Sequence, residues 1–254
     1  MRLFSDYSAD RDQRRADNGE RLTESHVSGY SRGGIRRRYE TMKKLIRVPC
    51  IDQTEQWPTG CESVSAVMLL HHLGVNISVD DFIRDCLTMQ EFQLSDEGKR
   101  IGADPRKAFA GNPYDAESMG CYAPVIVEAL RRALPEDKNW IIRDLTGVSM
   151  ETLCHEYLDR NRPVVFWACL EMREPVEGPE WYLDDGESQF RWISNEHCML
   201  LVGYDENHYY FNDPWQHRGT VGYARALTEA RHAAQYAMAV TAYSEEEQTG
   251  CRLI

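Results

Sequence analysis

The sequence lacks any long apolar run. No stretch approaches the roughly 18 to 20 consecutive apolar residues that a membrane-spanning helix requires, and the mean hydropathy is −0.57. The first twenty residues mix Asp and Arg without the apolar core of a secretory signal. The sequence as written therefore predicts a cytoplasmic protein without a membrane span. Export stays open if translation starts elsewhere, for example at Met42.

Short metal-binding spacings are also missing. The chain has eight cysteines and eight histidines, but no Cys-x2-Cys and no His-x3-His, the spacings that commonly indicate zinc sites. We therefore predict no metal and no cofactor. The cysteines are widely spread and several lie inside apolar runs, so most of them are expected to be buried free thiols rather than a disulfide framework.

Positive charge is scarce outside the N-terminal region. The whole chain has a net charge of −12, but residues 1–48 carry 12 basic against 7 acidic residues, which leaves 17 basic and 34 acidic residues in the remainder. A body with a net charge of −17 repels a phosphate backbone, which excludes nucleic acid as its partner. The basic run around Arg36–Lys44 is interpreted as solvated, with contact to RNA or an acidic surface as the alternative.

The chain divides into two parts. Residues 1–45 show no helical or strand periodicity and predict a flexible basic extension, whereas 46–254 predict one domain. Helices are expected at 59–73, 79–87, 123–134, 150–161 and 225–234, strands at 164–170, 197–204, 208–213 and 237–243, and a polar surface excursion at 89–119. An early helix followed by antiparallel strands predicts an α+β fold, in which the apolar first helix lies buried in the centre.

Cys61 lies near the start of that first helix. Thr59 and Glu62 match the spacing of a capping box, which would make Thr59 the N-cap and place Cys61 in the first turn. Unpaired backbone N–H groups and the helix dipole at this position favour an anion, so the sequence predicts a lowered thiol pKa and a nucleophilic thiolate.

A base and an orienting carboxylate are available in the predicted hairpin. A turn at 205–207 brings His197, at the start of one strand, opposite Asp213, at the end of the other. A carboxylate beside the imidazole fixes its tautomer and supports its charged form. His197 follows Cys61 by 136 residues, within the roughly 130 to 150 residues between nucleophile and base in papain-like enzymes. Gln53, or Gln56, could supply a side-chain donor to an oxyanion hole beside the Cys61 N–H.

Three stretches carry a family resemblance: VPCIDQTEQWPTGCESVSAVMLLHHLGV, GNPYDAESMGCYAPVIVEAL and EHCMLLVGYDENHYYFNDPW. Together they resemble the bacteriocin-processing-peptidase-like branch of the papain-like cysteine peptidases, peptidase family C39, over about residues 46–243. The resemblance implies a papain-like fold with Cys61 as nucleophile, His197 as general base, Asp213 as the orienting residue and Gln53 in the oxyanion hole. No transporter or nucleotide-binding portion accompanies these motifs, unlike the transporter-linked leader peptidases.

Several further residues are candidates for the substrate cleft. Trp57 precedes the first helix and is expected to cover the cleft, and Trp215 follows Asp213. The resemblance places residues 111–122 at a cleft wall. Cys121 is the internal rival to Cys61, but it lacks the capping box and the preceding glutamine. Cys198 is expected to point away from His197 into the core. The predicted substrate contacts are Trp57, Gly60, Gly120, Tyr122 and Trp215.

Together these patterns predict a cysteine peptidase or amidase acting on a peptide or protein substrate. By resemblance to the leader peptidases, cleavage is expected after small residues such as Gly-Gly. Two alternatives stay open: another acyl transfer on the same machinery, such as transamidation or deconjugation, and a peptide-binding module without turnover. The complete set of Gln53, Cys61, His197 and Asp213 argues against the second alternative.

Overall fold

The computed structural model describes residues 20–21, 44–136 and 138–244. The helices are α1 (Cys61–His72), α2 (Val79–Asp85), α3 (Ala123–Ala133), α4 (Met150–Thr152), η2 (Leu153–Tyr157), η3 (Leu158–Arg160), η4 (Leu170–Met172) and α5 (Arg225–Ala234). The strands are β1 (Glu20–Arg21), β2 (Lys44–Leu45), β3 (Met89–Gln90), β4 (Gln93–Leu94), β5 (Arg100–Ile101), β6 (Phe109–Ala110), β7 (Trp140–Asp144), β8 (Val164–Cys169), β9 (Glu177–Tyr182), β10 (Gln189–Ile193), β11 (Glu196–Tyr204), β12 (His208–Asp213), β13 (Gly219–Ala224) and β14 (Ala239–Ser244).

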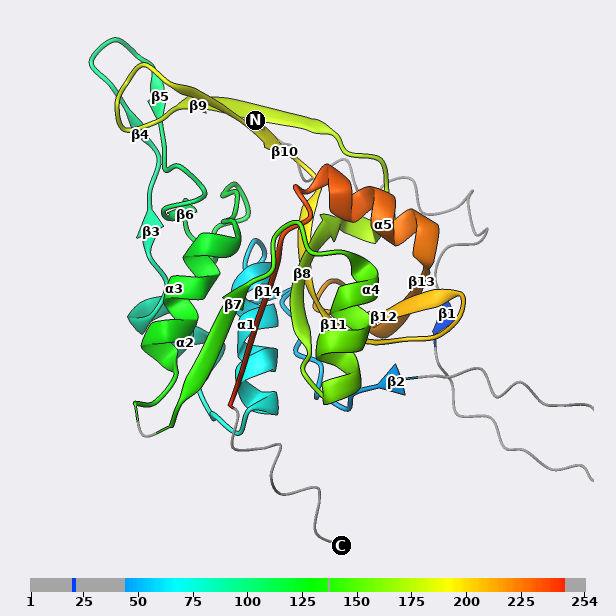
Figure 1. The fold of residues 1–254 in the computed structure, drawn as a ribbon. Coiled ribbons are helices and arrows are strands. Elements are labelled where there is room, and N and C mark those ends of the chain that lie inside the picture. Colours follow the sequence, from blue (N-terminus) through cyan, green and yellow to red (C-terminus); the bar gives the residue numbers. More distant parts are fainter. Residues whose placement is uncertain (1–19, 22–43, 137, 245–254) are drawn as a thin grey trace, which may run out of the picture.

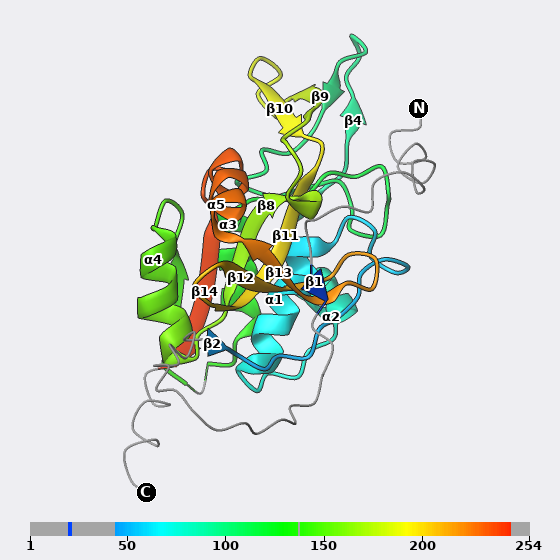
Figure 2. The same ribbon diagram turned by 90° about the vertical axis from the view of Figure 1, so that its right-hand side faces the viewer.

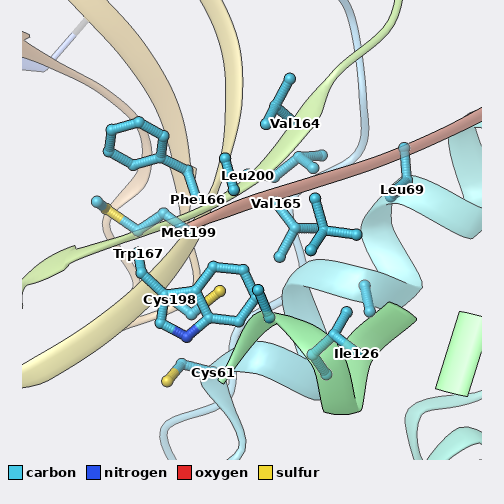
Figure 3. Close-up of a cluster of buried hydrophobic side chains, with 14 of the residues drawn as sticks. Cys61, Leu69, Ile126, Val164, Val165, Phe166, Trp167, Cys198, Met199 and Leu200 are labelled. Carbon is cyan, nitrogen blue, oxygen red and sulfur yellow. The ribbon is translucent and has the colours of Figure 1, made fainter. Parts of the chain in front are cut away.

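An antiparallel sheet of eight strands organises the domain. Its order is β1-β13-β12-β11-β8-β14-β7, with β2 paired to β11. Successive residues of β8 show that both faces are covered, because side chains alternate along a strand. Phe166 stacks on His232 of α5, with ring centroids 3.9 Å apart, whereas Trp167 lies in the cluster that contains Cys61 and Ile126 (Figure 3). Helices α1 and α5 therefore pack on opposite faces, which confirms the predicted α+β class.

Helix α1 is the central buried helix. Every residue from Cys61 to Leu70 is buried, because apolar side chains surround the helix and β8, β11 and α3 pack around it. Its few polar side chains must therefore find partners inside the protein. Ser65 donates a hydrogen bond to the Cys198 carbonyl at 3.3 Å, which ties the helix to the middle of β11.

The other predicted elements agree with the structure to within a few residues. Ser78 caps α2 by accepting from the Asp81 N–H, and Ser149 caps α4 by accepting from the Thr152 N–H. The helix expected at 150–161 continues as a π turn and a 3-10 turn, and Asn161 ends it at φ 61°. The extension predicted at 1–45 lies almost entirely outside the described residues; of the part described, β1 pairs with β13.

A second sheet of four strands projects from the domain (Figures 1 and 2). Its order is β10-β9-β5-β4. Strands β4 and β5 belong to the predicted polar excursion, and β9 and β10 form a hairpin that was not predicted from the sequence. Gly102 lies where the two parts meet. A Cβ there would lie 2.3 Å from the Phe92 ring and 3.0 Å from that of Trp181, so only glycine allows this contact.

Two further observations concern the whole of the described chain. No helix in the described ranges is both long and apolar enough to cross a membrane. The seven cysteines within those ranges are all free, and six of them are buried; Cys50 is exposed. This confirms the prediction of free thiols for the described part of the chain.

Candidate active site

Cys61 is the first residue of α1, as predicted for a thiol at a helix start. Gly60 occupies the N-cap position without a side-chain cap, and its lack of a Cβ matters because a Cβ would lie 2.8 Å from that of Trp57. The predicted capping box is wrong. Thr59 donates its hydroxyl to the Asp115 carbonyl at 3.0 Å, and Glu62 turns into the protein instead of back toward the helix start.

The interior contact of Glu62 explains this difference. Its Oε1 accepts the Cys121 N–H at 2.6 Å, and its Oε2 accepts the Cys61 thiol at 3.3 Å. Gly120 makes room for the carboxyl group, because a Cβ at Gly120 would lie 2.4 Å from Oε1. Glu62 is fully buried, and burial raises its pKa to about 7.

A second carboxyl group borders the same thiol. Glu196, the residue before His197 in β11, is half-buried, and its Oε1 is buried without a hydrogen-bond partner among the described residues. Burial, and then the nearby Glu62, raise the pKa of Glu196 well above its ordinary value. Neither carboxyl was predicted to lie in the site. The available signal was a glutamate in a largely apolar helix and another beside the proposed base.

These surroundings reverse the expected ionisation of Cys61. Burial raises the pKa of the thiol well above its ordinary value; Glu62, Glu196 and Cys198 raise it further, and the Cys198 N–H opposes them by lowering it. The prediction of a lowered pKa is therefore wrong for this arrangement. The helix dipole favours an anion at Cys61, but desolvation and two adjacent acidic groups outweigh it.

His197 and Asp213 form the predicted pair. His197 Nε2 lies 2.7 Å from Asp213 Oδ1, and the two side chains are only 3% and 0% exposed. The strand register pairs Leu200 with Asn212, so His197 and Asp213 are not directly opposite; their side chains meet diagonally across β11 and β12. The predicted contact is confirmed. Because Nε2 binds Asp213, Nδ1 is the nitrogen left for a thiol.

Asp213 is held as a carboxylate by several donors. Its Oδ1 also accepts the Trp215 N–H at 3.0 Å, and its Oδ2 accepts the Tyr223 hydroxyl at 3.3 Å, with Arg218 Nε at 4.0 Å. Burial alone would raise the pKa of Asp213, but His197, the Trp215 N–H and Arg218 outweigh it and lower the pKa. The Asp213 carboxyl group is therefore charged at neutral pH.

Gln53 lies on the segment that runs along the end of β12. Its N–H donates to the Pro214 carbonyl at 2.9 Å, and Asn212 donates to the Val48 carbonyl at 2.8 Å, which joins this segment to the Asp213 strand. The Gln53 side chain is 2% exposed. Its Nε2 donates to the Trp57 and Pro58 carbonyls at 3.3 and 3.2 Å, and its Oε1 has no partner in the described part of the chain. Gln56 is exposed, which favours Gln53.

No hydrogen bond joins Cys61 to His197 within the described residues; the thiol donates to Glu62 instead. Cys61 nevertheless lies against β11, since two of the groups that shift the pKa of its thiol are Glu196 and Cys198, the two neighbours of His197. Figure 3 shows Cys61, at the N-terminal start of α1, beside Trp167 and Cys198. Cys198 is fully buried, as predicted.

The predicted substrate contacts differ in how accessible they are. Trp57 is buried and donates its indole N–H to Asp80 at 2.8 Å, which fixes it to α2. Tyr122 is buried and stacks on Trp192 with centroids 5.4 Å apart. Trp215 is half-buried. Substrate contact by these residues, and by Gly60 and Gly120, stays a prediction.

Tertiary contact brings together three side chains that the sequence spacing did not connect. Among the described residues, the Cys61 sulfur and one carboxyl oxygen each of Glu62 and Glu196 all lie within 4.8 Å of one another. The adjacent His71 and His72 instead bind the Ile77 and Asn161 carbonyls. Cys121, the rival nucleophile, is fully buried, and its carbonyl accepts the Trp167 indole N–H.

A buried helix with a cysteine at its start, packed against a strand whose histidine binds an aspartate of the neighbouring strand, is the arrangement of a papain-like cysteine peptidase fold. The model of the peptidase C39 like family matches residues 45–245. The chain belongs to this family.

Two relatives support the assignment. YvpB of Bacillus subtilis strain 168, itself uncharacterised, is 26% identical over 161 residues, which is 63% of this chain and 59% of YvpB. The match thus spans less than two thirds of that relative. A crystal structure of a provisionally named C39-like peptidase from Bacillus anthracis is 26% identical with a TM-score of 0.68, covering 80% of this chain and 98% of that one.

Proposed function

We propose that this protein is a cysteine peptidase in which Cys61 attacks a peptide carbonyl with His197 as the base. The observation that carries the proposal is the buried hydrogen bond between His197 Nε2 and Asp213 Oδ1, 2.7 Å long, on the strand against which Cys61 packs. This bond leaves Nδ1 of His197 as the proton acceptor for the thiol. Membership of the C39-like family supports the same chemistry.

The proposed reaction begins when the Cys61 side chain turns from Glu62 to His197. Nδ1 takes the thiol proton, and the sulfur forms a bond to the carbonyl carbon. The N–H of Cys61 and the side-chain amide of Gln53 donate hydrogen bonds to the oxyanion. To do so, Gln53 Nε2 gives up one of its hydrogen bonds to the Trp57 and Pro58 carbonyls. The imidazolium then protonates the leaving amine, the C–N bond breaks, and water hydrolyses the thioester.

We propose that the residue before the scissile bond is small, such as glycine. Cys61 is only 6% exposed, and the buried Trp57 packs so closely that Gly60 has no room for a Cβ. A large side chain beside the sulfur would have to displace these groups. A Gly-Gly junction would not, because it presents only backbone near the thiol.

A peptide panel tests this proposal. The wild type, Cys61→Ala and His197→Ala would be incubated with peptides that contain Gly-Gly, Ala-Ala or Phe-Leu junctions, and the products identified by mass spectrometry. Cleavage at Gly-Gly that both substitutions abolish is the expected result. Cys86→Ala is the matched control, because Cys86 is a free cysteine at the end of α2 and belongs to neither the pair nor the start of α1. Cleavage retained in Cys61→Ala, or equal cleavage at all junctions, would contradict the proposal.

A further inference from the structure

Two carboxyl groups from different elements converge on the Cys61 thiol. Glu62 belongs to α1 and Glu196 to β11, and one carboxyl oxygen of each lies within 4.8 Å of the other and of the Cys61 sulfur. Glu62 Oε2 accepts the thiol hydrogen at 3.3 Å. A cysteine–histidine mechanism needs the thiol to lose its proton, and adjacent negative charge opposes that loss.

The position of Glu62 is specified by its surroundings. The Cys121 N–H binds one carboxyl oxygen at 2.6 Å, and Gly120 provides the space for it. The second oxygen is then directed at the thiol. Because α1 is buried along this whole segment, Glu62 cannot turn out to solvent without leaving these contacts.

Two carboxyl groups and a second thiol surround the Cys61 thiol. Glu62 faces it from α1, Glu196 and Cys198 from β11, and Cys121 lies beside Glu62. His197 gives its Nε2 to Asp213. Neither Glu62 nor Glu196 forms a salt bridge with any basic side chain of the described residues, and Glu196 Oε1 is buried without a partner there.

We propose that Glu62 and Glu196 are positioning residues that keep the Cys61 thiol protonated and directed at Glu62, so that the thiolate forms readily only when the pair has lost negative charge. This inference rests on the proposed function, because it describes what restrains the proposed nucleophile. Glu62 acts as acceptor of a thiol hydrogen bond, and the proton stays on sulfur. Neutralising the pair removes both the acceptor charge and the repulsion of a thiolate.

The test is the pH dependence of Cys61 alkylation. Wild type, Glu62→Gln and Glu196→Gln would react with iodoacetamide between pH 6 and 11, a range that extends above the ordinary pKa of a thiol, and peptide mass spectrometry would report the rate at Cys61. Glu62→Gln removes the negative charge that Glu62 carries above about pH 7, and Glu196→Gln removes the charge that Glu196 gains only well above its ordinary pKa. We expect the midpoint of each variant's profile to fall by about one pH unit, and the rate at pH 7 to rise about tenfold. A purely structural role for either glutamate would not move the midpoint in this direction.

Controls separate this effect from altered folding. The side-chain amide introduced by Glu62→Gln would retain an acceptor for the Cys121 N–H, and Glu196→Gln tests the half-buried partner if Glu62→Gln does not fold. Glu55→Gln changes an exposed glutamate on the loop before α1 and should leave the profile unchanged. An unchanged midpoint in both variants would overturn the proposal. A slower reaction would do so too, since it would make Glu62 the base for the thiol.

His197→Ala distinguishes this inference from the proposed function. If His197→Ala leaves Cys61 alkylation unchanged while Glu62→Gln accelerates it, the glutamates restrain the thiol but His197 does not activate it. If His197→Ala slows alkylation and both glutamine variants leave the profile unchanged, the proposed base stands and the restraint by the glutamates is refuted.

Discussion

The candidate site has two halves, the His197–Asp213 pair and the Cys61 thiol, and they differ in how far the structure favours the ionised form. At the end of β12, Asp213 is ionised and bonded to His197, with Trp215 and Tyr223 as further donors. At the start of α1, burial and two carboxyl groups oppose ionisation of Cys61, and the thiol faces Glu62. The proposed base is thus oriented in advance, whereas the surroundings of the proposed nucleophile favour its protonated form. The difference arises from the charges that each element brings, since the side chains of both halves are buried.

The largest effect is expected from a substitution in the His197–Asp213 pair. Asp213→Asn keeps the shape of the side chain but removes the charge that orients and supports the imidazole. By analogy with other triads we expect a loss of up to about 10⁴ in kcat, measured on the peptide that the wild type cleaves best. Asp96→Asn, at an exposed position between β4 and β5, is the control. Loss of less than tenfold would show that His197 does not depend on Asp213.

The second largest effect is expected at Gln53. Gln53→Ala removes the proposed side-chain donor to the oxyanion, and the loss of one such donor typically lowers kcat by about 10² to 10³. KM should change little, because the interaction forms in the transition state. Gln56→Ala, whose side chain is exposed, should have little effect. A rise in KM with unchanged kcat would assign Gln53 to ground-state binding instead.

A third prediction concerns how Glu62, beside Cys61, changes the stability of the protein with pH. The pKa of Glu62 is about 7 in the folded protein and close to its ordinary 4.5 when unfolded. The folded state then binds the extra proton, so Glu62 lowers stability as pH rises from about 4.5 to 7. Glu62→Gln should remove this loss, on the order of 3 kcal/mol, as measured by urea unfolding at pH 5 and pH 8. The two proteins should differ mainly at pH 8; a wild type that gains stability there relative to the variant would contradict the assignment.

The smallest effect is expected away from both halves. Ser78 caps α2 through its bond to the Asp81 N–H at 3.0 Å, so Ser78→Ala should lower the free energy of unfolding by about 1 kcal/mol. Activity should stay near the wild-type value, because Ser78 touches neither Cys61 nor His197. Thermal unfolding and the peptide assay on the same samples check both expectations. A loss of activity larger than the loss of folded protein would connect α2 to the site through Trp57.

The periodic elements and the paired residues were predictable because their signals are local. Continuous apolar residues indicated α1 and β8, and the short turn between two strands brought His197 to Asp213. The projecting hairpin β9–β10 was missed, since its strands alternate weakly and include Gly178 and Pro179. The capping box failed for another reason: Glu62 fits that motif, but the Cys121 N–H competes for its carboxyl group.

By itself, the sequence determined the class of fold, the helix that begins at Cys61 and the hairpin that joins His197 to Asp213, because hydrophobic periodicity and turn length act over neighbouring residues. Only the tertiary structure decided which protonation state of Cys61, the proposed nucleophile, is favoured. The pKa of Cys61 depends on burial and on Glu196, which lies 135 positions further along the chain. Electrostatic interactions depend on distance in space and on the exclusion of water, and neither can be read from spacing along the chain.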